Sequence, residues 1–168
     1  MYADEGIGVH FINFISKNYS FASDTNTIEF LDGGTMAAHL IPIIAEFDYL
    51  ILVDCIDADD ANIGDVYFFD YENMPKSVNW SGSAHEVEML ETLQMMDLVG
   101  DRPQTKIIGI IPKRIKPMEF SISQNCKNSL PLMEKILLKE LKNLNFSYQK
   151  TNDYSIEDII KIWEKEQF

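Results

Sequence analysis

Two short apolar runs constrain the fold of this chain more than any other feature. They are YLILV at residues 49–53 and KIIGIIP at residues 106–112. A strand that is apolar on both faces has to be covered on both faces, which is typical of the parallel sheets of α/β proteins. We therefore expect residues 49–53 to form a central parallel strand and residues 106–112 to form a second buried strand.

Helical patterns alternate with strand patterns along the rest of the chain. Between residues 7 and 19 the apolar residues crowd one face of a helix, and Asp4 is a candidate for its cap. Other helices are predicted at residues 35–47, 83–98, 129–144 and 155–165, and other strands at residues 27–31 and 66–69. Parallel neighbours need helical crossovers, so this alternation indicates a three-layer α/β/α fold, with a mostly parallel twisted sheet covered by helices on both faces.

Length and composition exclude several classes of protein. A chain of 168 residues fits one domain spanning residues 1–168, and it contains no run of about 20 apolar residues that would cross a membrane. The start, MYADEGIGVH, lacks the basic flank and apolar centre of a secretory signal, so a cytoplasmic location is expected. The net charge of −13 opposes nucleic acid binding. It serves solubility or steers a basic partner.

Four polar residues are predicted to gather at one rim of the sheet. Asp32 and Asp54 follow predicted strands, and Glu5 and His85 lie at predicted helix starts, which face the same edge. Two carboxylates and one imidazole suit a borderline divalent ion and leave positions open for water or substrate. The spacing alone is a weak signal. Under the alternative, Asp54 caps a turn, Glu5 favours the positive end of a helix, and His85 is an ordinary first-turn residue.

Five short blocks add a resemblance to a known family. They are DEGIGV at residues 4–9, LDGGT at 31–35, LVDCIDA at 52–58, SAHE at 83–86 and GIIP at 109–112. Their order and spacing, from residue 4 to about residue 112, resemble those of the hydrogenase maturation endopeptidases. The resemblance implies an enzyme that removes a C-terminal extension from the large-subunit precursor of a nickel–iron hydrogenase after the metal centre has been installed.

The resemblance also implies a site. Its metal-contacting residues are Glu5, Asp54 and His85, and the nickel they contact belongs to the substrate. Asp32 is the first candidate for a general base. The residues implied beside it for substrate binding are Gly33, Gly34 and Thr35.

Other protease chemistries have no support in the sequence. No Ser-His-Asp or Cys-His set is evident, and the His-Glu-x-x-His helix of zinc proteases is missing. Cys55 and Cys126 are interpreted as reduced, with Cys55 a small apolar residue on a buried strand. One alternative is a non-catalytic, nickel-binding or chaperone-like protein that docks on the precursor. A weaker one is a hydrolase of a small metabolite. A monomer is favoured.

The chain departs from the family at its start. Family members begin with an apolar strand and a Gly-x-Gly-Asn turn before the block at residues 4–9, and neither is present here. The simplest hypothesis is that Met1 is an internal methionine of a longer gene product. For the chain as given, we expect marginal stability and a poorly positioned Glu5, because unpaired strand groups in the interior are costly.

Overall fold

The sheet at the centre of the fold has three strands. The computed structural model describes residues 3–34, 37–79, 84–113 and 122–167, with side chains described except at residues 3, 84–87 and 166–167. The strand order is β2 (Tyr49–Cys55), β6 (Gln104–Ile110), β4 (Val66–Asp70). β2 and β6 are parallel, and β4 runs antiparallel to β6. The strands predicted near these positions are confirmed, and the sheet they form is mixed.

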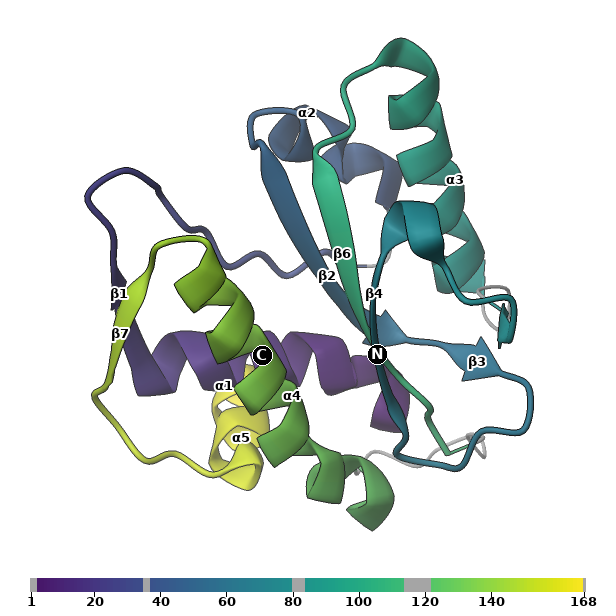
Figure 1. Cartoon of the computed structure of the whole chain (residues 1–168). Coiled ribbons are helices and arrows are strands. Elements are labelled where there is room, and N and C mark those ends of the chain that lie inside the picture. Colours follow the sequence, from purple (N-terminus) through teal and green to yellow (C-terminus); the bar gives the residue numbers. More distant parts are fainter. Residues whose placement is uncertain (1–2, 35–36, 80–83, 114–121, 168) are drawn as a thin grey trace.

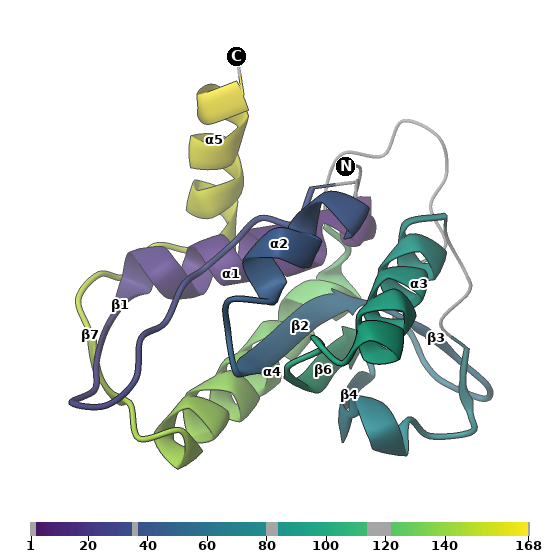
Figure 2. The same cartoon turned by 90° about the horizontal axis from the view of Figure 1, so that it is seen from above.

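Helices cover both faces of this sheet, which confirms the predicted three-layer fold (Figures 1 and 2). On one face lie α1 (Ile7–Asn18) and α4 (Gln124–Asn143), and α5 (Ile156–Gln167) packs against α1. On the other face lie η2 (Ala37–Leu40), α2 (Ile41–Ile44) and α3 (Ala84–Val99). Each side has its own hydrophobic core, and β6 contributes Ile108 and Ile110 to one and Ile107 to the other. Among the described helices, none is long and apolar enough to span a bilayer.

The central strand is β6, so the prediction of a central strand at residues 49–53 is wrong for the described part of the chain. β6 has partners on both edges, whereas β2 pairs only with β6 among the residues that the structure describes. The predicted strand at residues 27–31 is also absent: these residues form no ladder in the described structure. Ile28 and Phe30 pack against the core of the α1 face instead. Their alternating apolar pattern reflects this packing rather than strand pairing.

Several short elements were not predicted. β1 (Tyr19–Ala22) pairs antiparallel with β7 (Ser147–Lys150) beyond the ends of α1 and α4, and β3 (Asp57–Ala58) pairs with β5 (Val78–Asn79). A 3-10 turn, η1 (Ala3–Gly6), precedes α1, and another, η3 (Tyr71–Asn73), follows β4. The helix predicted at residues 35–47 is reduced to η2 and α2, where Pro42 lies at the start of α2.

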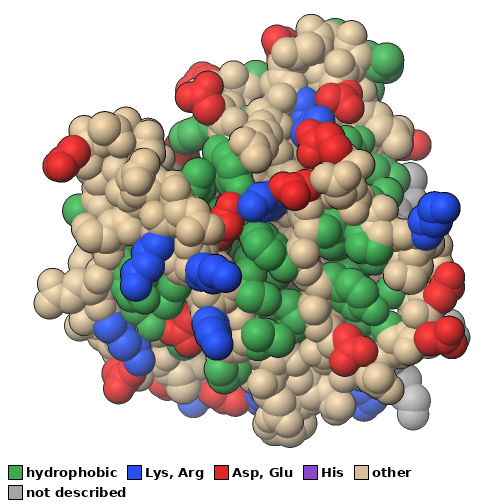
Figure 3. Space-filling view, in the orientation of Figure 1, with side chains coloured by type: hydrophobic (Ala, Val, Ile, Leu, Met, Phe, Trp, Pro, Cys, Tyr) green, Lys and Arg blue, Asp and Glu red, His purple; other side chains and the backbone are tan. Residues whose placement is uncertain are grey.

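The charge is unevenly distributed despite the net value of −13. Figure 3 shows a group of Lys and Arg side chains over and beside α4, next to hydrophobic side chains in the middle of the same face. Among the described residues, three positive side chains lie over aromatic rings: Lys142 over Tyr148 at 5.1 Å, Lys106 over Phe68 at 5.3 Å and Arg102 over Tyr71 at 4.4 Å. Local positive charge therefore coexists with the acidic balance of the whole chain.

Candidate active site

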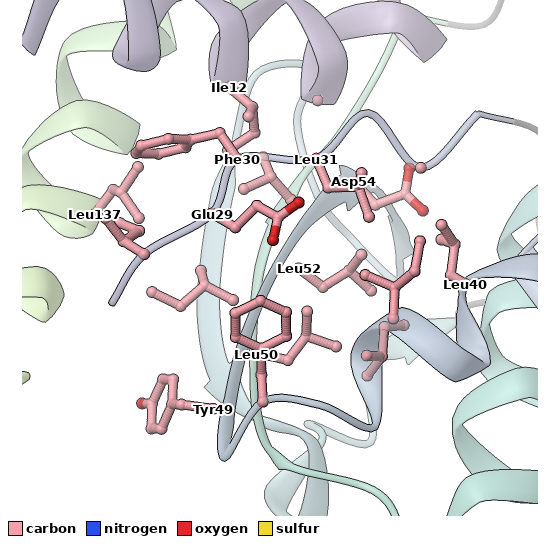
Figure 4. A pocket seen from close by; sticks show the side chains of 18 of the residues that line it. Ile12, Glu29, Phe30, Leu31, Leu40, Tyr49, Leu50, Leu52, Asp54 and Leu137 are labelled. Atoms are coloured by element: carbon pink, nitrogen blue, oxygen red, sulfur yellow. The ribbon is translucent and has the colours of Figure 1, made fainter. Parts of the chain in front are cut away.

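A groove of about 650 Å³ follows the edge of β2 that does not face β6 (Figure 4). All seven residues of β2, Tyr49–Cys55, line it. Successive side chains of a strand point to opposite faces of the sheet, so a cavity lined by all of them must run along the strand's edge. The groove therefore exposes the backbone edge of β2 as well as its side chains.

The opposite wall of the groove is the segment that was predicted to be a strand. Residues 25–31 line the groove together with Val9 and Ile12 of α1 and with Leu40 of η2. Most of these side chains are apolar. Glu29 is an exception, and Figure 4 shows its carboxylate pointing into the groove between the walls. Sequence reasoning missed Glu29. A single charge within an apolar, alternating segment was the available signal.

Glu5 and Asp54 form an acidic end of the groove where β2 ends, and Glu46 and Asp48 line the groove near the start of β2. Glu5 belongs to η1 and Asp54 to the end of β2, and both line the groove. The close packing of α1 on β2 brings them there, because a Cβ built at Gly8 would lie only 2.4 Å from the Val53 carbonyl oxygen. Only glycine fits this contact. Asp54 Oδ1 also accepts a hydrogen bond from the Cys55 N–H at 2.8 Å, which orients its carboxylate.

Asp4, the neighbour of Glu5, has the opposite environment. It is only 1% exposed, and its two carboxylate oxygens accept the N–H groups of Lys113 at 2.8 Å and Ser123 at 2.6 Å. The prediction that Asp4 caps α1 is therefore wrong. The N-cap position is Gly6, with no side-chain cap. The Asp4 carboxylate instead satisfies two backbone donors elsewhere in the fold.

The residues around Asp32 form a tight turn beside the groove. Asp32 Oδ1 accepts the Gly34 N–H at 2.9 Å, and Gly34 has a φ of +60°, a conformation that favours glycine. Gly33 and Gly34 line the groove; Asp32 is exposed and is not among the described lining residues. Thr35 lies outside the described residues. The assignment of Asp32 as the base stays a prediction.

His85 lies in the first turn of α3, and its side chain is outside the described part of the structure. Met89, one helical turn later, lines the groove. Residues four apart share a helix face, so the backbone position of His85 is on the face of α3 that borders the groove. Among the described side chains, no three His, Cys, Asp or Glu residues form a metal-binding group. The set of Glu5, Asp54 and His85 therefore stays a prediction.

Cys55, interpreted from the sequence as a small residue on a buried strand, and His10 are both buried. Cys55 is 2% exposed at the end of β2. His10 is 9% exposed and stacks edge-on against Trp163 at 5.3 Å, and its burial lowers the pKa of the imidazole. Cys55 lines the groove, but its thiol donates a hydrogen bond to the Asp4 carbonyl at 3.1 Å, so the interpretation of Cys55 as a small residue on a buried strand is supported.

Comparison with known proteins identifies the family. The family model described as "Hydrogenase maturation protease" matches residues 9–140. The chain belongs to this family. It is therefore an endopeptidase that acts in hydrogenase maturation, and the resemblance of its five sequence blocks is confirmed.

Individual relatives agree with this assignment. The chain is 41% identical to Protein HydD of Wolinella succinogenes over 152 residues, which cover 90% of this chain and 95% of that protein. It is 27% identical to the hydrogenase 2 maturation protease of Escherichia coli over 115 residues, 68% of each chain. The solved structure of the hydrogenase maturating endopeptidase HybD from E. coli matches with a TM-score of 0.78 at 22% identity, covering 91% of this chain and 93% of that one. That likeness shows the fold.

Proposed function

We propose that this endopeptidase removes a C-terminal extension from the large-subunit precursor of a nickel–iron hydrogenase after nickel insertion, and that Glu5, Asp54 and His85 recognise the nickel carried by the precursor. The observation that carries the proposal is the acidic end of the groove, where Glu5 and Asp54 line one cavity from two separate elements. Two carboxylates, with an imidazole from α3, match the ligands that a borderline divalent ion accepts.

The groove suits binding of the precursor segment that is to be cleaved. It is about 650 Å³ in volume, largely apolar, and bordered by an edge of β2 that is free of strand partners within the described residues, so it suits an extended segment of chain. Gly33 and Gly34 bring backbone rather than side chains to the wall next to Asp32. We assign them, with Thr35, to substrate binding, and Asp32 to the general base that takes a proton from the attacking water.

The nickel is substrate in this proposal, not a resident cofactor. When bound, such an ion polarises the scissile carbonyl or lowers the pKa of a bound water. The chain's own residues hold the nickel-carrying precursor and orient it. Two carboxylates present negative charge to the ion: Asp54, oriented by the Cys55 N–H, and Glu5, which belongs to η1. A precursor without nickel carries no positive ion to pair with these carboxylates. Processing would then depend on completed metal insertion.

The test is a pair of histidine substitutions. His85→Ala is expected to lower the rate of precursor cleavage by about 10²-fold or more, since it removes one of three metal contacts. His39→Ala is the matched control, because His39 is an exposed histidine in η2 that does not line the groove. Cleavage is followed as a mobility shift of the nickel-loaded precursor on a gel. Wild-type cleavage by the His85→Ala protein, with folding retained, would remove His85 from the site. Precursor binding without cleavage by the wild type would favour the chaperone-like alternative.

A further inference from the structure

Asp4 holds together three parts of the chain that are far apart in sequence. Its Oδ1 accepts the N–H of Ser123 at 2.6 Å, and its Oδ2 accepts the N–H of Lys113 at 2.8 Å. Its backbone carbonyl accepts the thiol of Cys55 at 3.1 Å, at the end of β2. η1, the end of β2 and the two segments that contain Lys113 and Ser123 therefore meet at one residue.

The Cys126 thiol completes this buried junction. Its Sγ lies 3.3 Å from Asp4 Oδ2, and the side chain has no exposed surface. Burial is the main cause that raises the pKa of the Cys126 thiol to about 11, so the thiol keeps its proton and donates a hydrogen bond to the carboxylate. A buried carboxylate needs such donors on both oxygens, because an unpaired buried charge is strongly destabilising.

This junction lies directly beside the acidic end of the groove. Asp4 and Glu5 are consecutive residues of η1, yet Asp4 is buried and Glu5 is exposed and lines the groove. We propose that Asp4 is the positioning residue of the site, which anchors η1 so that the Glu5 carboxylate is held beside Asp54. The proposal rests on the proposed role of Glu5 in recognising the precursor's nickel.

The decisive variant is Asp4→Asn. Asparagine has the same shape, but its NH₂ group would face one of the two backbone donors, so one anchor is lost. Glu140→Gln is the matched control. Glu140 is 5% exposed and accepts hydrogen bonds from Tyr49 at 2.6 Å and Lys106 at 2.8 Å, near the opposite ends of β2 and β6 from Asp54. Both changes are expected to lower the melting temperature.

Two readouts separate positioning from simple loss of stability. At a temperature where both variants are folded, Asp4→Asn is expected to lower kcat for the nickel-loaded precursor by about tenfold or more, and Glu140→Gln to leave it within about twofold. Hydrogen exchange of the amides of residues 5–8, measured without precursor, should speed up in Asp4→Asn alone. Wild-type kcat in folded Asp4→Asn, or unchanged exchange at residues 5–8, would overturn the proposal.

A second pair of variants serves if Asp4→Asn does not fold. Ser123 has a φ of −62°, which proline accepts, so Ser123→Pro deletes the N–H donated to Asp4 without changing the backbone angle. Ser123→Ala keeps that N–H, and both variants lose the hydroxyl that caps α4. We expect kcat to fall only in Ser123→Pro, and equal kcat values would overturn the proposal. Hydrogen exchange at residues 5–8 could be faster in Ser123→Pro while the wild type fails to cleave the nickel-loaded precursor. That result would support the positioning of Glu5 by Asp4 and contradict the proposed substrate.

Discussion

Asp4 and Glu5 are neighbours in sequence, and they belong to two regions with opposite physical character. Asp4 is part of a closed junction in which both carboxylate oxygens accept backbone hydrogen bonds. Glu5 belongs to an open groove beside a strand edge that has no strand partner in the described part of the chain. The contrast shows how a short 3-10 turn can present one exposed acid for function: the acid before it is buried and supplies the anchor. Junction substitutions should therefore change both stability and activity, whereas groove substitutions should change activity with little effect on stability.

The largest expected effect is a loss of cleavage rate caused by a substitution in the groove. Asp54→Asn should lower the cleavage rate by about 10²–10³-fold, the usual cost of removing a group that stabilises charge in a reaction, while the melting temperature changes little. Glu29→Gln is the matched control, because Glu29 is a groove carboxylate away from the acidic end. Gel assays on both variants check this. Equal losses in the two variants would mean that the whole groove, not its acidic end, carries the chemistry.

The second effect is on stability and belongs to the junction. Asp4→Asn should lower the free energy of unfolding by about 1–3 kcal/mol, because it leaves a buried backbone donor unpaired. Glu5→Gln should change it by less than about 0.5 kcal/mol, since Glu5 is exposed. Urea unfolding followed by circular dichroism measures both. Similar losses in the two variants would contradict the division between junction and groove.

A third expectation concerns the open edge of β2. The groove leaves that edge without a strand partner among the described residues. If a strand added at the N-terminus pairs with this edge, the melting temperature should rise by about 5 °C, because the added strand would cover apolar surface and pair backbone groups. Thermal melts with and without the added strand test this, and equal melting temperatures would show that the edge gains no partner.

The smallest effect is a pH dependence at the junction. The folded pKa of the Cys126 thiol is raised to about 11, from an ordinary value of 9.0, so folding favours the neutral thiol. Its contribution to stability is therefore complete below pH 9 and is lost as the pH rises from 9 to 11. Between pH 9 and 11, stability measured by urea melts should fall more steeply in the wild type than in Cys126→Ala, by at most about 1.4 kcal/mol per pH unit. Identical slopes in the two proteins would contradict the effect.

The parts of the fold that the sequence predicts are those with strong local patterns. The apolar strands, α1 and the long helices were found because their periodicity is set by burial against the sheet. The segment at residues 27–31 was misassigned because an alternating pattern shows which side chains are buried but not whether a strand lies alongside. Its neighbour β2 is separated from it by the groove, so no ladder forms.

For the site, the sequence predicted the neighbourhood of Glu5 and Asp54, and their role stays a prediction. Glu5 and Asp54 were expected at one rim, and they line the same end of one groove. The role of Asp4 was not predictable, because its partners, the backbone N–H groups of Lys113 and Ser123, leave no side-chain signature in the sequence. A cap was the local alternative, and the tertiary fold offered the carboxylate two buried donors instead.

The most direct test of the central claim compares one precursor in two states. The wild-type enzyme is incubated with the hydrogenase large-subunit precursor loaded with nickel and, separately, with the same precursor free of nickel. If Glu5, Asp54 and His85 recognise the substrate's metal, the loaded precursor is shortened at its C-terminus and the nickel-free precursor stays intact. Equal cleavage of the two forms would contradict the account.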